Sequence, residues 1–282
     1  MENEIVEYEN MLDYYCKKYS NLEQIKEFLL QSDLPIPYKD LKIYPIKIKL
    51  SRFFFMFAGC LTLEQYKVGD IKALQMKYLD FLFYKNIQLG INNEGYAEAF
   101  KEVLYMCLRI PRTFLDVNNN EIPTIDFIYS NNHYFIKIYN KTYNAKDFEE
   151  IRGIICEQNL LELPDASVSE DIKKKYEEYI EHLKKIGRIK TGDFEDLSLC
   201  LMAELGYTKE QVGELTIRTF YKLLERVGFI IDVKISQLLS PNLEKEYVKK
   251  IPNWTDKITK KNKFEEMSTN YSELEGKVKG AN

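Results

Sequence analysis

The spacing of apolar residues changes twice along this chain, and this change limits the fold more than any other feature of the sequence. Apolar residues recur at helical spacing before residue 111 and again after residue 144. Between them, residues 112–144 are rich in the β-branched and aromatic residues that favour strands. We therefore predict a mainly α protein with a small antiparallel β element, an α+β fold in which a helical core accompanies a β-meander at about residues 112–144.

The part before the meander is predicted to hold one edge strand among helices. Residues 4–31 show helical spacing, and Ser20 is placed to cap a second helix within them. In residues 41–49 apolar and basic residues alternate, with Pro45 at one step, which is typical of an exposed edge strand. Three apolar helices are predicted to form the main core. They cover residues 51–63, 70–89 and 96–109.

Turn residues divide the meander into short strands. Ser130–Asn131–Asn132 separates two β-rich runs, and adjacent asparagines tolerate the positive φ of a tight turn. Asn140–Lys141 suggests a second turn, followed by a short third strand at Thr142–Tyr143.

Capping residues mark the helices that follow. Asn144 begins a helix that runs to about residue 158. Residues 208–211 form a capping box, and Thr216 caps a longer helix that reaches residue 239. Two further helices are predicted at residues 167–186 and 193–205, each followed by glycine.

These elements group into four predicted parts. Residues 1–32 form a helical segment, and residues 33–144 form the helical core with its edge strand and meander. Residues 145–240 form a second helical domain. Residues 241–282 are rich in lysine and glutamate, and we expect a flexible or partner-ordered tail.

The sequence offers little material for catalysis or metal binding. The chain has only two histidines, His133 at the predicted hairpin turn and His182 on a charged helical stretch. Its five cysteines are scattered singly at apolar positions, as buried thiols are in a reducing compartment. Motifs for phosphate loops, serine nucleophiles and zinc proteases are absent. We expect no enzyme, no catalytic residue, no metal site and no cofactor.

One pair of residues invites comparison with a metal-dependent nuclease. Asp126 lies on one predicted strand and Lys137 on its neighbour. A strand-borne Mg²⁺ site needs a second acid next to the lysine, and Phe135 and Ile136 stand there instead. A nuclease is therefore disfavoured.

A nucleic-acid-associated protein is the alternative interpretation. Residues 193–227 predict a helix, a glycine turn and two further helices, the order of a helix-turn-helix. Acidic and basic side chains are mixed along them, which favours protein packing over contact with a duplex. The formal net charge of −4 also argues against a general nucleic-acid or membrane-surface binder.

Two stretches are the preferred contacts with a protein partner. The edge strand presents a basic and aromatic face, and a lone tryptophan in the polar stretch after residue 241 is suited to anchor it on a partner. The candidate partner-binding residues are Lys42, Tyr44, Lys47, Lys49 and Trp254.

Several segments, in this order and spacing, resemble known phage proteins. They include Leu-Pro-Ile-Pro-Tyr-Lys at 34–39, and residues 41–50, 76–82, 148–152, 158–159, 164–165, 215–218 and 223–226. Across about residues 33–230 the chain resembles tail and baseplate assembly proteins of phages of low-GC Gram-positive bacteria. Those proteins are distantly similar to the T-even-type baseplate hub and tail-assembly chaperone family.

The resemblance implies a non-enzymatic structural or assembly protein that binds other tail or baseplate proteins, with self-association left open. It implies no membrane partner, and it places the chain in the host cytoplasm during assembly, with the virion tail as a further location. Residues 1–10 agree with a cytoplasmic origin, because they are acidic and lack the pattern of a secretory signal.

Overall fold

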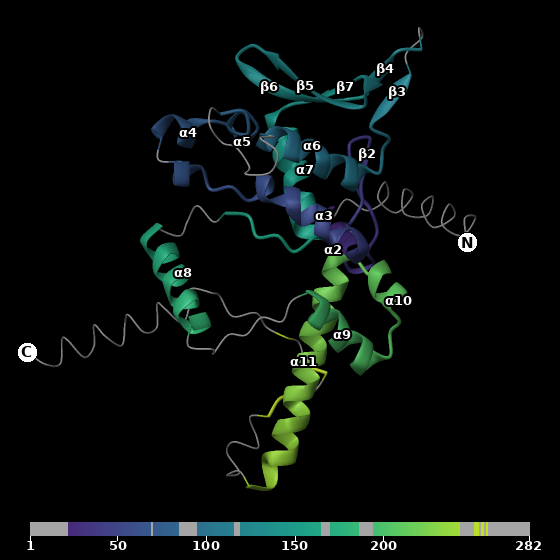
Figure 1. The fold of residues 1–282 in the computed structure, drawn as a ribbon, viewed down its shortest axis with the longest axis vertical. Helices are drawn as coiled ribbons and strands as arrows, with labels where there is room; N and C mark the ends of the chain where they lie inside the picture. The colour runs from purple at the N-terminus through teal and green to yellow at the C-terminus, as the bar shows by residue number, and fades with distance from the viewer. Residues whose placement is uncertain are drawn as a thin grey trace, which may run out of the picture. The chain divides into compact units, whose positions relative to one another are not determined.

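The chain forms two compact units, each described here by itself. The computed structural model describes residues 22–68, 70–84, 95–115, 119–164, 170–185, 194–242, 251–253, 255–256 and 258 (Figure 1). The first unit comprises residues 1–164 and 213–220, and the second comprises residues 165–212 and 221–282. These limits differ from the predicted domain limits, because the helix after the meander and a short segment near residue 216 both belong to the first unit.

The first unit combines helices with small antiparallel sheets (Figure 1). Its helices are α2 (Leu22–Gln31), α3 (Ile48–Ala58), α4 (Ile71–Gln75), α5 (Tyr78–Phe81), α6 (Tyr96–Leu108) and α7 (Ala145–Gln158), with 3-10 turns η1 (Gly59–Leu61) and η2 (Gln65–Val68). Its strands are β1 (Ile36–Tyr38), β2 (Leu41–Ile43), β3 (Thr113–Leu115), β4 (Glu121–Pro123), β5 (Ile125–Ser130), β6 (His133–Ile138) and β7 (Lys141–Tyr143). The predicted mainly α fold with small antiparallel sheets is confirmed.

The predicted meander is confirmed as the sheet β5–β6–β7, and β3 and β4 form a separate hairpin before it. Asn131 and Asn132 have φ values of 50° and 63°, so both central residues of the β5–β6 turn take the left-handed conformation that a two-residue hairpin requires. The next turn is also left-handed, at Tyr139 with φ 51°.

Helix α7 begins as predicted and anchors the core of the first unit. The Asn144 side chain accepts hydrogen bonds from the backbone N–H groups of Lys146 and Asp147, and the Asp147 carboxylate accepts one from the Asn144 N–H. From this capped start, α7 packs against α5, β2, β6 and β7. Its buried side chains, Phe148, Ile151 and Ile155 among them, are fully enclosed.

The prediction of an edge strand at residues 41–49 is correct for the first three residues and wrong for the rest. β2 ends at Ile43, and α3 begins at Ile48 instead of residue 51. In place of a partner strand, three separate segments accept the N–H groups that follow. Tyr44 donates to the Cys107 carbonyl (2.7 Å), Ile46 to the Asn159 side chain (3.0 Å) and Ile48 to the Leu215 carbonyl (2.8 Å).

The predicted helix at residues 70–89 is also interrupted. Met76 and Lys77 are extended, with ψ near 147° and 144°, and they separate α4 from α5. The Gln65 amide donates to the carbonyls of Ala73 and Met76 (2.7 and 3.0 Å), so a side chain from outside the helix adds hydrogen bonds at the end of α4. The helix predicted at residues 96–109 is confirmed as α6, which ends at Arg109 in the left-handed conformation (φ 53°).

The second unit is helical in its described part. It contains α8 (Glu170–Lys185), α9 (Phe194–Leu205), most of α10 (Lys209–Glu214) and of α11 (Ile217–Leu239), and the turn η3 (Ser240–Asn242). The predicted caps are confirmed: Gly206 ends α9 with φ 69°, and Thr208 and Gln211 exchange hydrogen bonds of 2.9 and 3.2 Å. The caps predicted at Ser20 and around residue 168, and the tail after residue 258, lie outside the described residues.

Candidate protein-binding surface

Helix α11 has one apolar side that is exposed within the second unit. Ile231, Ile235 and Leu238 are 37%, 50% and 78% exposed, whereas Val233 on the opposite side is only 2% exposed. The exposed residues follow the four-then-three spacing with which one helix packs along another. A helix that is apolar on both sides normally has both sides covered. The exposed side of α11 is therefore suited to bind a second protein surface.

Charges flank this apolar side on both edges. At 100° per residue, Asp232 and Lys234 lie on opposite edges of the line from Ile231 to Leu238, and both are exposed. A partner surface with mixed charges fits such edges better than the uniformly negative surface of a nucleic acid.

A second exposed apolar face lies on α3 in the first unit. Leu50, Phe53 and Met56 are 41%, 60% and 42% exposed. The opposite side of α3, which includes Ile48 and Phe54, is buried and packs against α6 and η1.

Two of the predicted partner-binding lysines meet at one carboxylate beside α3. Lys47 and Lys49 both form ion pairs with Glu214, and the hydrogen bonds from these two lysines lower the pKa of Glu214 to about 2. Lys47 also pairs with Thr216 through a single β-bridge. The structure thus brings these two predicted residues together on an internal contact with the segment 213–220.

The other predicted partner residues are dispersed. Lys42 lies exposed in β2, opposite Pro37 of β1. Tyr44 is half-buried, and the Arg109 guanidinium lies over its ring at 4.2 Å from the centroid. Trp254 lies outside the described residues. Partner binding by these residues stays a prediction.

A polar network that the sequence did not indicate joins the β1–β2 hairpin to the start of α7. Tyr38 donates to Asp147 (2.7 Å), and Lys39 forms an ion pair with the same carboxylate (2.5 Å). In parallel, Tyr143 donates to Asp40 (2.8 Å), which also pairs with Lys141 (2.7 Å). Only the capping pattern at Asp147 could have pointed to this network.

The charges in this network stabilise the contact between the β1–β2 hairpin and the start of α7, which we call the clasp. Burial, together with the neighbouring Asp147, raises the pKa of Tyr38 to about 12. Burial alone would raise the pKa of Asp147, but Lys39, Tyr38 and the Asn144 N–H together lower it. The hydrogen bond from Lys141 leads the lowering of the Asp40 pKa. The tyrosines thus stay protonated as donors and the carboxylates stay charged as acceptors.

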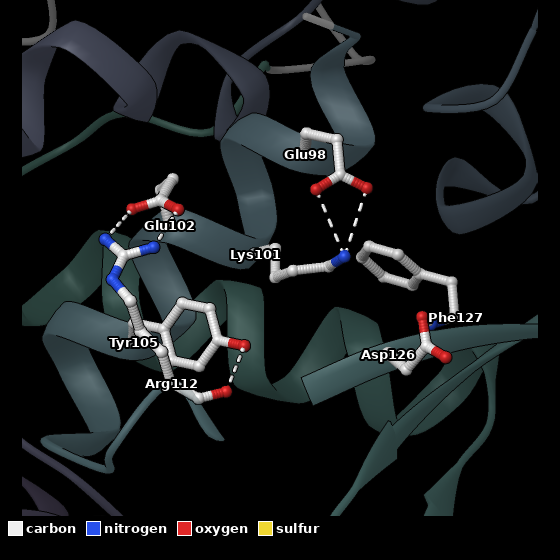
Figure 2. Close-up of polar contacts among 7 residues, drawn as sticks. All are labelled: Glu98, Lys101, Glu102, Tyr105, Arg112, Asp126 and Phe127. Carbon is white, nitrogen blue, oxygen red and sulfur yellow. Dashed lines mark hydrogen bonds and ion pairs between the residues drawn. The ribbon is translucent and has the colours of Figure 1, made fainter. Parts of the chain in front are cut away.

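Figure 2 shows the surroundings of Asp126, the carboxylate of the disfavoured nuclease site. Asp126 accepts from the N–H of its neighbour Phe127 (2.9 Å) and stands opposite Lys137 in the β5–β6 register. Lys101 of α6 lies over the Phe127 ring at 5.6 Å and pairs with Glu98. Among the described residues, no group of three or more potential ligands is placed to hold a metal ion.

The two histidines have different surroundings. The Nδ1 atom of His133 lies 2.8 Å from Asp80, whose other oxygen accepts from the Tyr134 N–H (2.8 Å). Asp80 thus holds the β5–β6 hairpin to α5. His182 is exposed on α8.

Cations of the predicted helix-turn-helix have partners within the chain. Arg218 donates to the Glu157 carbonyl (3.1 Å), Lys222 pairs with Glu225 (3.2 Å) and Arg226 donates to the Asp256 carbonyl (2.9 Å). The Lys222–Glu225 ion pair offsets one positive charge, and the two carbonyl contacts occupy donors of Arg218 and Arg226 that a nucleic-acid backbone would need.

Within the described ranges, every helix is too short or too polar to cross a lipid bilayer. Comparisons of the chain with protein-family models, with curated proteins and with solved structures found no match.

Proposed function

We propose that this chain is a non-enzymatic structural or assembly protein of a phage tail or baseplate, and that it binds other tail or baseplate proteins through the exposed side of α11. The observation that carries the proposal is the line of Ile231, Ile235 and Leu238, exposed opposite the buried Val233. The resemblance of segments between about residues 33 and 230 to phage tail proteins supplies the class of partner.

The energetic reason is the apolar area that this side leaves in water. Full burial of an isoleucine or leucine side chain contributes about 1.5–3 kcal/mol. Three such residues on the same side of α11 therefore favour association with an apolar groove or helix of a partner. Binding of this kind needs neither a cofactor nor a titrating group, and it takes place in the host cytoplasm during assembly.

The test is co-expression of the full chain with tail and baseplate proteins from the same phage, followed by size-exclusion chromatography. We expect a complex with at least one of them. Ile235→Asp and Leu238→Asp should weaken this complex by about tenfold or more, because a charge replaces buried apolar area. The matched control is Ile71→Asp, at a side chain of α4 that is 73% exposed and lies in the other unit, and it should leave the complex intact.

Each result separates one part of the proposal from the rest. A complex that survives both α11 substitutions would show that another surface binds the partner. Failure to find a complex with any tail or baseplate protein would contradict the proposed function itself. Retention of DNA by the chain, with affinity that falls steeply with salt, would favour the nucleic-acid alternative instead.

A further inference from the structure

Strand β5 has one edge that no described strand covers. Its other edge is occupied by β6, and in the part of the chain that the structure describes no strand pairs with this open edge. The opposite edge of the same sheet, β7, is three residues long and begins with Lys141. A short strand and a lysine are common protections of an exposed edge. β5 has six residues and its only charge is that of Asp126, so it lacks both protections.

The hairpin register shows which backbone groups face the open edge. The two-residue turn pairs Ser130 with His133, so the even-numbered residues of β5 exchange hydrogen bonds with β6. The Thr124 carbonyl continues this pattern, because it accepts from the Tyr139 N–H (2.7 Å). The odd-numbered residues therefore direct their N–H and C=O groups away from β6. They are Ile125, Phe127 and Tyr129.

A side chain occupies one of these outward groups. The Asp126 carboxylate accepts from the Phe127 N–H (2.9 Å), which a neighbouring strand would take up in the middle of a sheet (Figure 2). Tyr129 is 60% exposed and Ile128 is 37% exposed, so the end of the strand is open to solvent. The contact of Lys101 with the Phe127 ring is a contact with a face of β5 and not with its edge, because side chains project from the faces of a sheet.

A second copy of β5 fits this edge when the two strands run antiparallel with Phe127 at the centre. Outward groups then meet outward groups: Phe127 faces Phe127 of the other copy, and Ile125 faces Tyr129. Aromatic–aromatic and aromatic–β-branched pairs of this kind stabilise sheets. Asp126 faces Ile128 of the other copy, so no like charges stand opposite each other. The contact is two-fold symmetric, and it therefore closes after two copies.

We propose that two copies of the chain associate by antiparallel pairing of β5 with β5, centred on Phe127. The two three-stranded sheets become one continuous sheet, in which the outward N–H groups of each β5 donate to carbonyls of the other. Asp126 limits this association, because its carboxylate holds the Phe127 N–H that the second copy needs. The contact is separate from partner binding by α11, so either can fail without the other.

The first test measures the mass of the full chain by analytical ultracentrifugation over a range of concentrations. We expect a monomer–dimer equilibrium. Tyr129→Pro should raise the dimer dissociation constant by about tenfold or more, because proline removes an outward N–H and leaves the hydrogen bonds to β6 in place. The matched control is Thr142→Pro in β7, whose N–H faces the other open edge by the same alternation, and it should leave the dimer unchanged.

The outcomes separate β5 from other surfaces. A parent chain that stays monomeric at every concentration would overturn the proposal. So would a dimer that Tyr129→Pro does not weaken, or one that Thr142→Pro weakens equally. Leu238→Asp should leave the dimer intact, and loss of the dimer in this variant would assign self-association to α11 instead. Circular dichroism of each variant checks that it remains folded.

A second test addresses the role of Asp126. Asp126→Ala frees the Phe127 N–H and should lower the dimer dissociation constant by about fivefold. The control Glu150→Ala removes an equal charge from an exposed position of α7 and should have no effect. An unchanged or weaker dimer in Asp126→Ala would overturn the role given to this carboxylate.

A disulfide reports the register directly. Positions 126 and 128 of the two copies form a pair without hydrogen bonds, with Cα atoms about 4.5 Å apart, which suits a disulfide. In a chain with Cys16→Ser and Cys200→Ser, we combine Asp126→Cys with Ile128→Cys. Oxidation should give a covalent dimer, and peptide mapping should join position 126 of one copy to position 128 of the other.

The control for the disulfide combines Asn140→Cys with Thr142→Cys in the same background, at exposed positions near the other open edge. It should give no covalent dimer. Equal yields of covalent dimer in the two chains would overturn the proposal, because they would show random collision. A dimer joined from position 126 to position 126 would overturn the register centred on Phe127.

Discussion

The phenol of Tyr38 donates a 2.7 Å hydrogen bond to the carboxylate of Asp147, which lies 109 residues later in the chain. The same carboxylate completes the capping box of α7. One buried side chain therefore starts a helix and also holds the β1–β2 hairpin against it. The stability of the first unit should depend on the charge of this group.

Asp147→Asn should destabilise the chain by about 2 kcal/mol at neutral pH, since the variant loses the ion pair with Lys39 and weakens the cap. The milder Tyr38→Phe removes a single hydrogen bond and should cost about 1 kcal/mol. Urea unfolding measures both. An equal loss in the two variants would show that the charge of Asp147 has no part in the clasp.

The free energy of unfolding should also depend on pH through the carboxylates of Asp147 and Asp40. The folded pKa of Asp147 lies below its ordinary value, as does that of Asp40. Their contributions are therefore complete above about pH 5 and are lost as the pH falls through the lower, folded pKa values. Urea unfolding at a series of pH values should show a shallower acid loss in Asp147→Asn than in the parent chain. Identical slopes would contradict this assignment.

Arg152→Ala should destabilise the chain by about 3 kcal/mol. The guanidinium is buried, donates to the Leu61 carbonyl (2.6 Å) and lies over the Tyr78 ring at 3.5 Å from the centroid. Arg152→Lys should not rescue stability, because an ammonium lacks the planar group that stacks and donates together. Lys146→Ala, an exposed change on the same helix, should stay within about 0.5 kcal/mol. Thermal unfolding compares the three, and rescue by lysine would show that charge alone is needed.

Asp33 combines an unusual backbone conformation with two hydrogen bonds, and three substitutions should separate these effects. Its φ is 56°, and its carboxylate accepts from Thr216 and Thr219. Asp33→Asn should be the mildest, since asparagine tolerates this conformation and keeps one acceptor. Asp33→Gly loses the hydrogen bonds alone, whereas Asp33→Ala also adds backbone strain and should cost about 2–3 kcal/mol in total. Urea unfolding that ranks alanine above glycine in stability would contradict this account.

Thiol reactivity should divide the described cysteines into two groups. Cys60, Cys107 and Cys156 are buried, and burial raises all three pKa values, that of Cys156 to about 11. Cys200 is exposed. Iodoacetamide should therefore modify Cys200 in the native protein and reach the other three only after unfolding. Peptide mapping measures this, with a Cys200→Ser chain as the control, and rapid labelling of Cys107 would contradict the packing of α6.

Local signals were the predictable part of this fold. The starts of α7, α10 and α11 and the asparagine turn of the meander all appear where the sequence predicts them. Each depends on hydrogen bonds or backbone preferences within about four residues, so neighbouring residues are sufficient to specify it. The candidate site was less predictable. An apolar helix at α11 follows from periodicity, but periodicity cannot tell which of its apolar sides the rest of the chain covers.

By itself the sequence determined the class of the fold, the starts of α7, α10 and α11, and the asparagine turn of the meander. Only the tertiary structure decided that residues 44–48 leave the sheet, because the N–H groups of Tyr44, Ile46 and Ile48 find acceptors about 60 to 170 positions away. It also decided that Lys47 and Lys49 meet Glu214, and that Val233 is covered while Leu238 is exposed. The physical reason is the same in each case: contacts between residues far apart in the chain form only when the whole unit is folded, and no spacing of neighbours encodes them.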